Sequence, residues 1–201
     1  MNILGINVIG SHAWNMNNEN SDLDLFIVDV ENTSNILKGI GNARKSKSYT
    51  IGKIDIVIHE VEKVVNQLID GNINYIVGIL SPLNIYTNKY FDELKEITKN
   101  NLAKNCYYSI NGWIRGNYDR YLSQNPNDEK RKKLIMRTLN FGINILNGSG
   151  VVFNKVDDIS LDDIKRSFSE LEEAYKNSKL PDKPNEDIFR EWLYKLRKDL
   201  L

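Results

Sequence analysis

Two short segments in the first sixty residues alternate between two kinds of side chain, and this pattern constrains the fold most. Residues 23–30 (LDLFIVDV) and 53–58 (KIDIVI) place acidic and apolar residues at alternating positions. Successive side chains of a strand point to opposite faces of a sheet, so a period of two predicts strands with two different faces. Residues 3–9 form another apolar run, which is expected to be a strand that ends at Gly10 and Ser11.

Beyond about residue 59 the apolar side chains recur at helical spacing instead. A first helix is expected from residue 61 to Gly71, a C-cap by its residue type, and residues 73–80 form a second apolar stretch. From Asn88 onward no strand pattern is present. Amphipathic helices are expected over residues 89–99, about 101–123, 129–147, 160–177 and 185–200. The chain is therefore predicted to be α+β, with a mixed sheet and helices followed by an all-helical C-terminal part.

The composition narrows the class of protein. The 27 basic and 27 acidic residues cancel, so there is no strong basic surface for duplex DNA. Cys106 is the only cysteine, which excludes a disulfide or a cysteine-based zinc site within the chain and suits a cytoplasmic protein. The N-terminus is expected to be a strand and not a signal peptide. No apolar run is long enough to cross a membrane.

Gly10, Ser11 and three aspartates form the pattern that points to chemistry. Asp22 and Asp24 are two residues apart on an extended segment, so both carboxylates are expected on one face of the sheet. Such carboxylates repel each other unless a cation lies between them, and Mg²⁺ takes oxygen ligands. Asp55 is expected to complete the site as a metal ligand or as a base. At Gly10 a phosphate group can approach the backbone closely, and Ser11 adds a hydroxyl group that can bind a phosphate oxygen.

A Gly-Ser pair, ten residues, Asp-x-Asp and a separate Asp on a later strand resemble the polymerase-beta-type nucleotidyltransferase superfamily. The resemblance covers roughly residues 3–60. It implies a small mixed sheet with helices behind it, and transfer of a nucleoside monophosphate from a nucleoside triphosphate to a hydroxyl group. It also implies that Asp22, Asp24 and Asp55 are the catalytic and metal-binding residues. The cofactor would be two Mg²⁺ ions, with Mn²⁺ as the alternative.

A narrower resemblance, to the "predicted nucleotidyltransferase" family of bacteria and phages, covers most of the chain. It rests on GSHAW at 10–14, SDLD at 21–24, residues 60–68, Asn72, LSP at 80–82 and the Leu-Pro-x-x-Pro turn at 180–184. The expected domains are a nucleotidyltransferase catalytic domain over residues 1–88 and a helical domain over residues 89–201. Asn15 stands where relatives usually have glycine, and the arginine that often follows Asp-x-Asp is lacking.

Basic residues at the start of the segment 129–147 are candidates for contact with a triphosphate. Lys133 and Arg137 are four residues apart, so they share one helical face, and related enzymes place basic helical residues across the cleft. They are therefore predicted to bind the nucleotide together with Gly10 and Ser11. The alternative is that the run Lys130–Lys133 is the solvated start of a helix.

Other polar and aromatic residues have simpler interpretations. Trp14 is expected in the core rather than against a base, and His12 is expected to be partly exposed. Glu60 is interpreted as an acidic residue in the first turn of a helix, and not as half of a metal pair with His59. Asp29 is five residues beyond Asp24 on the same strand, and this odd spacing is expected to place it on the other face of the sheet. Packing between the domains is favoured over base stacking for the aromatic residues Tyr107, Tyr108, Trp113, Tyr118 and Tyr121.

Three functions are compatible with these patterns. The first is an enzyme that binds a nucleoside triphosphate and modifies an RNA end, a small molecule or a protein hydroxyl. The second is a nucleotidyltransferase-like antitoxin or another regulatory protein that binds a partner, suggested by analogy alone. The third is a phosphate or metal sensor without turnover. The sequence favours the enzyme, because all three aspartates are present.

Overall fold

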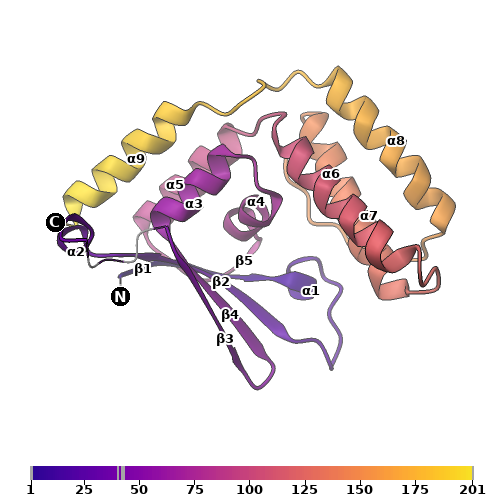
Figure 1. Ribbon diagram of the computed structural model, residues 1–201, viewed down its shortest axis with the longest axis horizontal. Helices are drawn as coiled ribbons and strands as arrows, with labels where there is room; N and C mark the ends of the chain where they lie inside the picture. Colours follow the sequence, from indigo (N-terminus) through magenta and orange to yellow (C-terminus); the bar gives the residue numbers. More distant parts are fainter. Residues whose placement is uncertain (1, 40, 42–43, 201) are drawn as a thin grey trace. The chain divides into compact units, whose positions relative to one another are not determined.

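The computed structural model describes residues 2–39, 41 and 44–200, and the chain folds into two compact units (Figure 1). The sheet unit comprises Met1–Asp70, Asn74–Asn101 and Asn185–Leu201. The helical unit comprises Gly71–Ile73 and Leu102–Pro184. The last helix of the chain therefore belongs to the unit that contains the first strand.

A mixed five-stranded sheet forms the base of the sheet unit, with the strand order β3-β4-β2-β1-β5. The strands are β1 (Asn2–Ile9), β2 (Leu23–Val30), β3 (Ser46–Ile51), β4 (Ile54–Glu60) and β5 (Leu83–Thr87). β2 and β4 run parallel, and the other neighbouring pairs run antiparallel. The two strands with the clearest alternation in the sequence are therefore direct neighbours.

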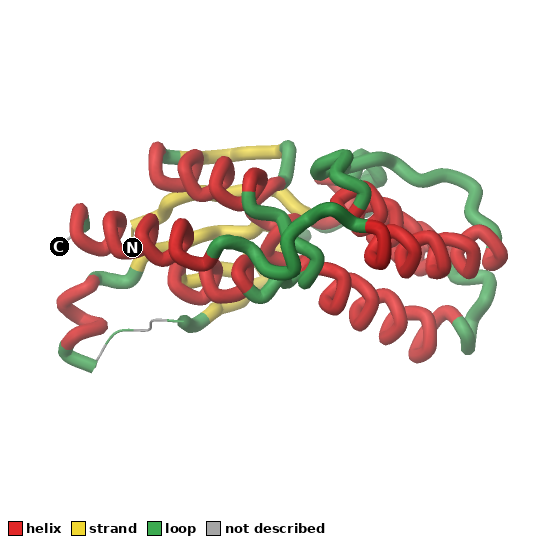
Figure 2. Tube along the Cα trace, turned by 90° about the horizontal axis from the view of Figure 1, so that it is seen from above, coloured by secondary structure: helices red, strands yellow, loops and turns green. Residues whose placement is uncertain are grey.

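Helices lie on one side of this sheet (Figures 1 and 2). They are α3 (Val61–Ile69), α4 (Ile73–Leu80), α5 (Lys89–Asn100) and α9 (Glu186–Asp199), while the short helices α1 (Gly10–Ala13) and α2 (Thr33–Leu37) follow β1 and β2. The fully buried Asn7 on β1 donates hydrogen bonds from Nδ2 to the carbonyl oxygens of Gly78 and Ile79 on α4, at 2.8 and 3.2 Å. A Cβ on Gly78 would lie 2.5 Å from the ring of Phe26 on β2, so strand and helix approach closely here. Asn7 and Phe26 therefore mark the covered face of the sheet.

The helical unit contains α6 (Cys106–Asn117), a π-helix η1 (Tyr118–Leu122), α7 (Glu129–Leu146) and α8 (Leu161–Asn177). Its core is apolar, with the fully buried side chains Ile110, Ile114, Leu122, Ile135, Leu139 and Ile145. Ser160 and Asp163 form a capping box at the start of α8, in which each side chain accepts a hydrogen bond from the other residue's backbone. Tyr107 stacks on Tyr175 of α8, with ring centroids 4.2 Å apart. This contact of Tyr107 lies inside the helical unit, whereas the sequence favours packing between the domains.

The predicted α+β class is confirmed, and the differences lie in local elements. The sequence does not predict β3 and β5, because both are edge strands with mostly exposed side chains and so lack an apolar pattern. The long helix expected over about 101–123 begins at Cys106 and gives way at Tyr118 to the π-helix. The predicted domain boundary after residue 88 stays a prediction. Among the described residues, no helix is long and apolar enough to cross a bilayer.

Candidate functional site

Asp24 and Asp55 are neighbours across the parallel pair β2 and β4. Their Cα atoms are direct partners in the register, and Leu23 at the start of β2 donates its N–H to the carbonyl oxygen of Lys53, 2.8 Å away. Partners in a ladder project to the same face, and this face also carries Phe26 and its partner Val57. The two carboxylates therefore lie side by side on the covered face, where the first residues of both strands meet.

Gly10 lies directly against the Asp24 carboxylate. It follows Ile9, the residue of β1 paired with Asp24, and its φ of +63° is in the left-handed region that favours glycine. A Cβ at this position would lie 1.8 Å from Asp24 Oδ2. Only glycine fits both the backbone conformation and the space beside this carboxylate, so the sequence pattern of Gly10 and Asp24 corresponds to a physical contact.

Ser11, His12 and Trp14 belong to the short turn of helix that follows Gly10. Trp14 is 4% exposed, which places it in the core as predicted. His12 is partly exposed as predicted, although its Nε2 atom is buried and has no hydrogen-bond partner among the described residues. Ser11 is partly exposed next to Gly10. Asn15 adopts a left-handed φ of +53°, a conformation that asparagine tolerates better than most residues.

Asp55 has a hydrogen-bond partner that the sequence patterns do not predict. Thr50 Oγ1 donates to Asp55 Oδ1 at 2.7 Å, because Thr50 on β3 is the direct partner of Asp55 in the β3–β4 hairpin. The sequence does carry a signal for this pairing, since Gly52 and Lys53 connect the two strands by a turn. The hydrogen bond fixes one oxygen of the carboxylate.

Asp22 completes the predicted set but lies just outside the strand. It is exposed and precedes the first residue of β2. Within the described part of the chain, no three or more His, Cys, Asp or Glu side chains are grouped closely enough to hold a metal ion. The donors themselves suit a hard cation, because the paired carboxylates of Asp24 and Asp55 supply oxygen ligands on one face. A bound Mg²⁺ ion would be held by Asp24 and Asp55 from the sheet.

The predicted nucleotide contacts Lys133 and Arg137 lie on α7, in the helical unit. Two neighbours in the basic run have structural contacts instead. Lys132 is 9% exposed and its Nζ is 2.7 Å from Glu129 Oε1, while the Arg131 guanidinium lies 4.3 Å from the ring centroid of Tyr121. Part of the run therefore stabilises the start of α7, and the role of Lys133 and Arg137 stays a prediction.

His59, the last residue of β4 on the covered face, is buried between aromatic rings. Its ring centroid lies 4.7 Å from those of Phe26 and Tyr75, and its Nδ1 atom is 2.7 Å from Ser46 Oγ. Burial lowers the pKa of His59 from 6.5 to about 4, and the charge of Lys63 acts in the same direction. His59 is therefore neutral at physiological pH and behaves as a core residue.

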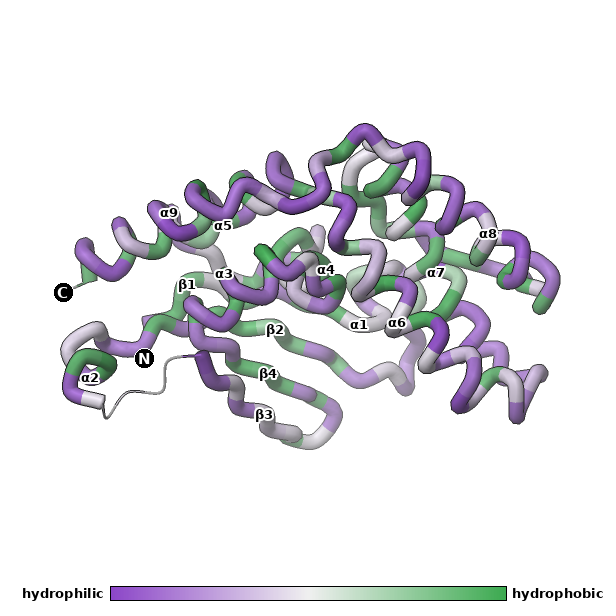
Figure 3. The backbone as a smooth tube through the Cα atoms, turned by 45° about the horizontal axis from the view of Figure 1, so that its top comes forward, coloured by the Kyte–Doolittle hydropathy of each residue, from purple (hydrophilic) through white to green (hydrophobic). Residues whose placement is uncertain are grey.

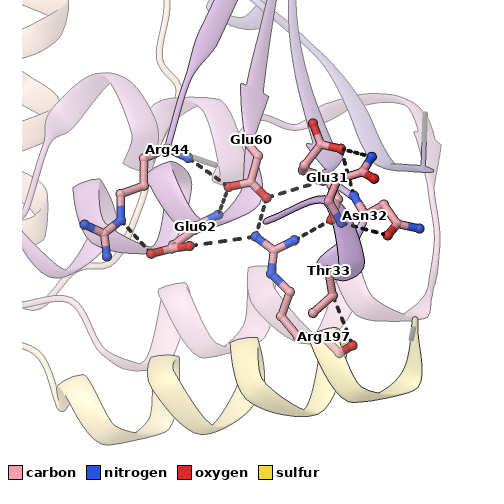
Figure 4. Close-up of polar contacts among 8 residues, drawn as sticks. Glu31, Asn32, Thr33, Arg44, Glu60, Glu62 and Arg197 are labelled. Carbon is pink, nitrogen blue, oxygen red and sulfur yellow. Dashed lines mark hydrogen bonds and ion pairs between the residues drawn. The ribbon is translucent and has the colours of Figure 1, made fainter. Parts of the chain in front are cut away.

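Glu60, at the far end of β4 from Asp55, is the centre of a polar cluster (Figure 4). It is the N-cap of α3 rather than a first-turn residue, and its carboxylate accepts hydrogen bonds from the backbone N–H groups of Glu62 and Arg44, at 2.8 and 3.2 Å. Arg197 on α9 donates from Nη2 to Glu60 Oε1 at 2.5 Å and from Nη1 to the carbonyl oxygen of Glu31 at 2.7 Å. This cluster joins the last helix to the sheet.

A cavity of about 540 Å³ lies at this same end of the strands, with Asp29, Lys45, Lys47 and Glu60 among its lining residues. Asp29 pairs with Glu60 in the β2–β4 register, five residues beyond the pair of Asp24 and Asp55. The odd spacing places Asp29 on the opposite face from Asp24, as predicted. The cavity is therefore separate from the predicted catalytic residues.

Similarity to known proteins indicates the class of protein to which this site belongs. Residues 1–154 match the model of the family described as RlaP, RNA repair pathway DNA polymerase beta family. Over 165 residues the chain is 28% identical to the uncharacterized protein MJ0002 of Methanocaldococcus jannaschii, a match that covers 67% of this chain and 68% of that protein. A crystal structure of a nucleotidyltransferase-like protein from Exiguobacterium sibiricum is similar over 99% of this chain and 69% of its own, with 12% identity and a TM-score of 0.31.

The mixed sheet, the adjacent carboxylates and the family match together define a polymerase-beta-like nucleotidyltransferase. The match to residues 1–154 covers most of the chain. The chain belongs to the RlaP family, the RNA repair pathway DNA polymerase beta family. The superfamily predicted from Gly10, Ser11 and the three aspartates is confirmed.

Proposed function

We propose that this protein transfers a nucleoside monophosphate from a nucleoside triphosphate to a hydroxyl group, with Asp22, Asp24 and Asp55 holding Mg²⁺. The observation that carries the proposal is the direct pairing of Asp24 with Asp55, with Gly10 packed against Asp24. Membership of a polymerase-beta family supports the reaction class. Bound Mg²⁺ would supply positive charge to stabilise the charge on the phosphoryl oxygens and on the attacking and leaving oxygens.

The residues of the chain bind and orient the reactants in this proposal. Gly10 has no side chain, so a phosphate group can approach the backbone beside Asp24, and the Ser11 hydroxyl donates to a phosphate oxygen. Thr50 on β3 donates a hydrogen bond to one oxygen of Asp55 and so fixes the orientation of this carboxylate. Lys133 and Arg137 are proposed to contact the triphosphate through their charges.

An RNA end is the favoured acceptor among the three that the sequence leaves open. The description of the matched family names an RNA repair pathway, and an RNA end carries the hydroxyl group that the reaction requires. A small molecule or a protein hydroxyl is the alternative. Incubating the protein with each α-labelled nucleoside triphosphate, Mg²⁺ and an oligoribonucleotide tests the favoured acceptor, because the RNA band then gains label and length.

The site itself is tested by Asp24→Asn, with Asp29→Asn as the matched control. Both residues lie on β2 and are partly exposed, but they project to opposite faces of the sheet. Removing the charge at Asp24 is expected to lower transfer about a hundredfold or more, since even residues that only support a metal ligand contribute about 10–100-fold. Asp29→Asn is expected to leave transfer unchanged. Equal activity of Asp24→Asn and the native protein would refute the assignment of the site.

A further inference from the structure

Residues 115–137 carry an excess of positive charge that the rest of the chain lacks. They include the end of α6, the π-helix η1 and the first half of α7, all in the helical unit. Seven of these residues are basic and three are acidic, so the segment has a net charge of +4 in a chain of net charge zero. Figure 3 shows the connection from α6 to α7 mostly in the hydrophilic colour. The charge therefore suits a local site for a polyanion.

Tyr121 on η1 is an exposed aromatic residue in the middle of this segment. Its exposed fraction is 49%, and the Arg131 guanidinium lies over its ring, 4.3 Å from the centroid. Arg131 is itself fixed, because its Nη1 donates to Asn117 Oδ1 at 2.7 Å and its backbone N–H donates to Asp128 Oδ1 at 2.9 Å. The guanidinium thus orients the Tyr121 ring and adds a positive charge beside it, while half of the residue stays open to solvent.

Arg120 and Lys130 add two more cations close to this pair in the sequence. Both are exposed, and within the described part of the chain neither side chain has an ion pair or a hydrogen bond. Two of the three acidic residues are occupied, since Asp128 is the N-cap of α7 and Glu129 forms an ion pair in the first turn of that helix. Asp119 is the remaining acid. The charge that faces solvent around Tyr121 is therefore mainly positive.

We propose that this part of the helical unit binds a single-stranded segment of the acceptor RNA. The residues that form the Tyr121 surface are Arg120, Tyr121, Lys130 and Arg131. Proteins bind single strands by placing cations against the phosphates and an aromatic ring against a base. The bases of a duplex are stacked on one another and leave none for Tyr121, so the surface favours single strands. The inference rests on the proposed function, which makes RNA the acceptor.

Fluorescence anisotropy of a labelled single-stranded RNA of about 12 nucleotides tests the binding, a length within the range of known single-strand sites. The full chain is used without nucleoside triphosphate and without Mg²⁺, so that binding is measured apart from the reaction. Each phosphate contact steepens the dependence of log affinity on log salt by about 0.7 for a single strand. Arg120→Gln/Lys130→Gln is therefore expected to bind about 25-fold more weakly at about 0.1 M salt, with a slope shallower by about 1.4.

Tyr121 is tested by replacing it with alanine and with phenylalanine. Tyr121→Ala is expected to weaken binding at least about fivefold, whereas Tyr121→Phe keeps the ring and should bind like the native protein. Lys179→Gln/Lys183→Gln is the matched control for charge, because both lysines are exposed in the same unit but outside residues 115–137. This control is expected to keep the native affinity. Far-UV circular dichroism checks that each variant is folded.

Three results would overturn the proposal. They are a native protein that does not bind the RNA at up to about 100 µM, a duplex of the same length that binds as tightly, and a folded Arg120→Gln/Lys130→Gln variant that binds like the control. Asp24→Asn is expected to bind the RNA like the native protein. RNA binding without nucleotide transfer would therefore refute the proposed reaction and leave the Tyr121 surface in place.

Discussion

Replacing Gly10 by alanine should separate the geometry of the site from the stability of the fold. The added Cβ would lie 1.8 Å from Asp24 Oδ2, whereas carbon and oxygen atoms without a bond stay about 3.3 Å apart. The carboxylate must therefore move by about 1.5 Å, or the backbone of Gly10 must leave its φ of +63°. A displacement of about 1 Å at a reacting centre can lower a rate about a hundredfold.

The loss of stability should be small enough to leave the protein folded, because a domain is stable by about 5–15 kcal/mol. Alanine in the left-handed region costs about 1–2 kcal/mol, and displacement of a partly exposed carboxylate adds a similar amount at most. For a chain of this size, about 1 kcal/mol corresponds to about 2–4 °C in the melting temperature. Gly10→Ala is thus expected to melt about 2–16 °C lower and to lose at least about a hundredfold in nucleotide transfer.

Gly39→Ala is the control for backbone strain alone. Gly39 also has a positive φ, of +72°, but a Cβ at this position would meet no described atom within 4 Å. The variant should therefore lose about 1–2 kcal/mol in the free energy of unfolding and keep full activity. The measurements are differential scanning calorimetry and transfer of labelled nucleotide. A native transfer rate in Gly10→Ala would refute a role for the contact between Gly10 and Asp24 in the reaction.

Three other substitutions have expected outcomes. Arg197→Ala should lower the free energy of unfolding in urea by about 2–4 kcal/mol, because it leaves the buried Glu60 carboxylate without its charged partner, whereas the exposed Lys195→Ala should change it by less than about 0.5 kcal/mol. Thr50→Val should lower transfer while Thr50→Ser restores it, because only the hydroxyl group donates to Asp55. The lowered pKa of His59 means that the native protein loses stability as pH falls from about 6.5 to about 4, because the unfolded chain binds a proton first. In His59→Gln the free energy of unfolding in urea should depend less on pH between about 6.5 and about 4. An unchanged dependence on pH would show that His59 is not the group responsible.

The strand positions of Asp24 and Asp55 follow from local sequence patterns, but the contacts around these residues do not. Alternation in two segments is enough to place Asp24 and Asp55 on strands, and the structure makes these strands neighbours. The contact of Gly10 with Asp24 follows from the pairing of Ile9 with Asp24, so the spacing of these residues in the sequence has a direct geometric meaning in the fold. The bond from Thr50 escapes prediction because β3 is an exposed edge strand without an apolar pattern.

Long-range pairs are beyond sequence reasoning for a different reason. The sequence interpretation of Glu60 as a first-turn acidic residue is wrong by one position, because Glu60 is the N-cap of α3. Its partner Arg197 is 137 residues away, and no periodicity or spacing relates two positions so distant. Alternation places Asp24 and Asp55 on the other face from Leu25 and Ile56, but it does not predict which face the helices cover.

The bond between Glu60 and Arg197 also has a consequence for the order of folding during synthesis. Ribosomes add about 5–20 residues per second, so the 137 residues that separate the two side chains take about 7–27 s to make. Throughout that time β4 can pair with β2, while the Glu60 carboxylate still lacks its guanidinium partner and α9 does not yet cover the sheet. The nascent sheet unit is therefore expected to stay open to chaperones and proteases until the helical unit has been completed and α9 has left the ribosome.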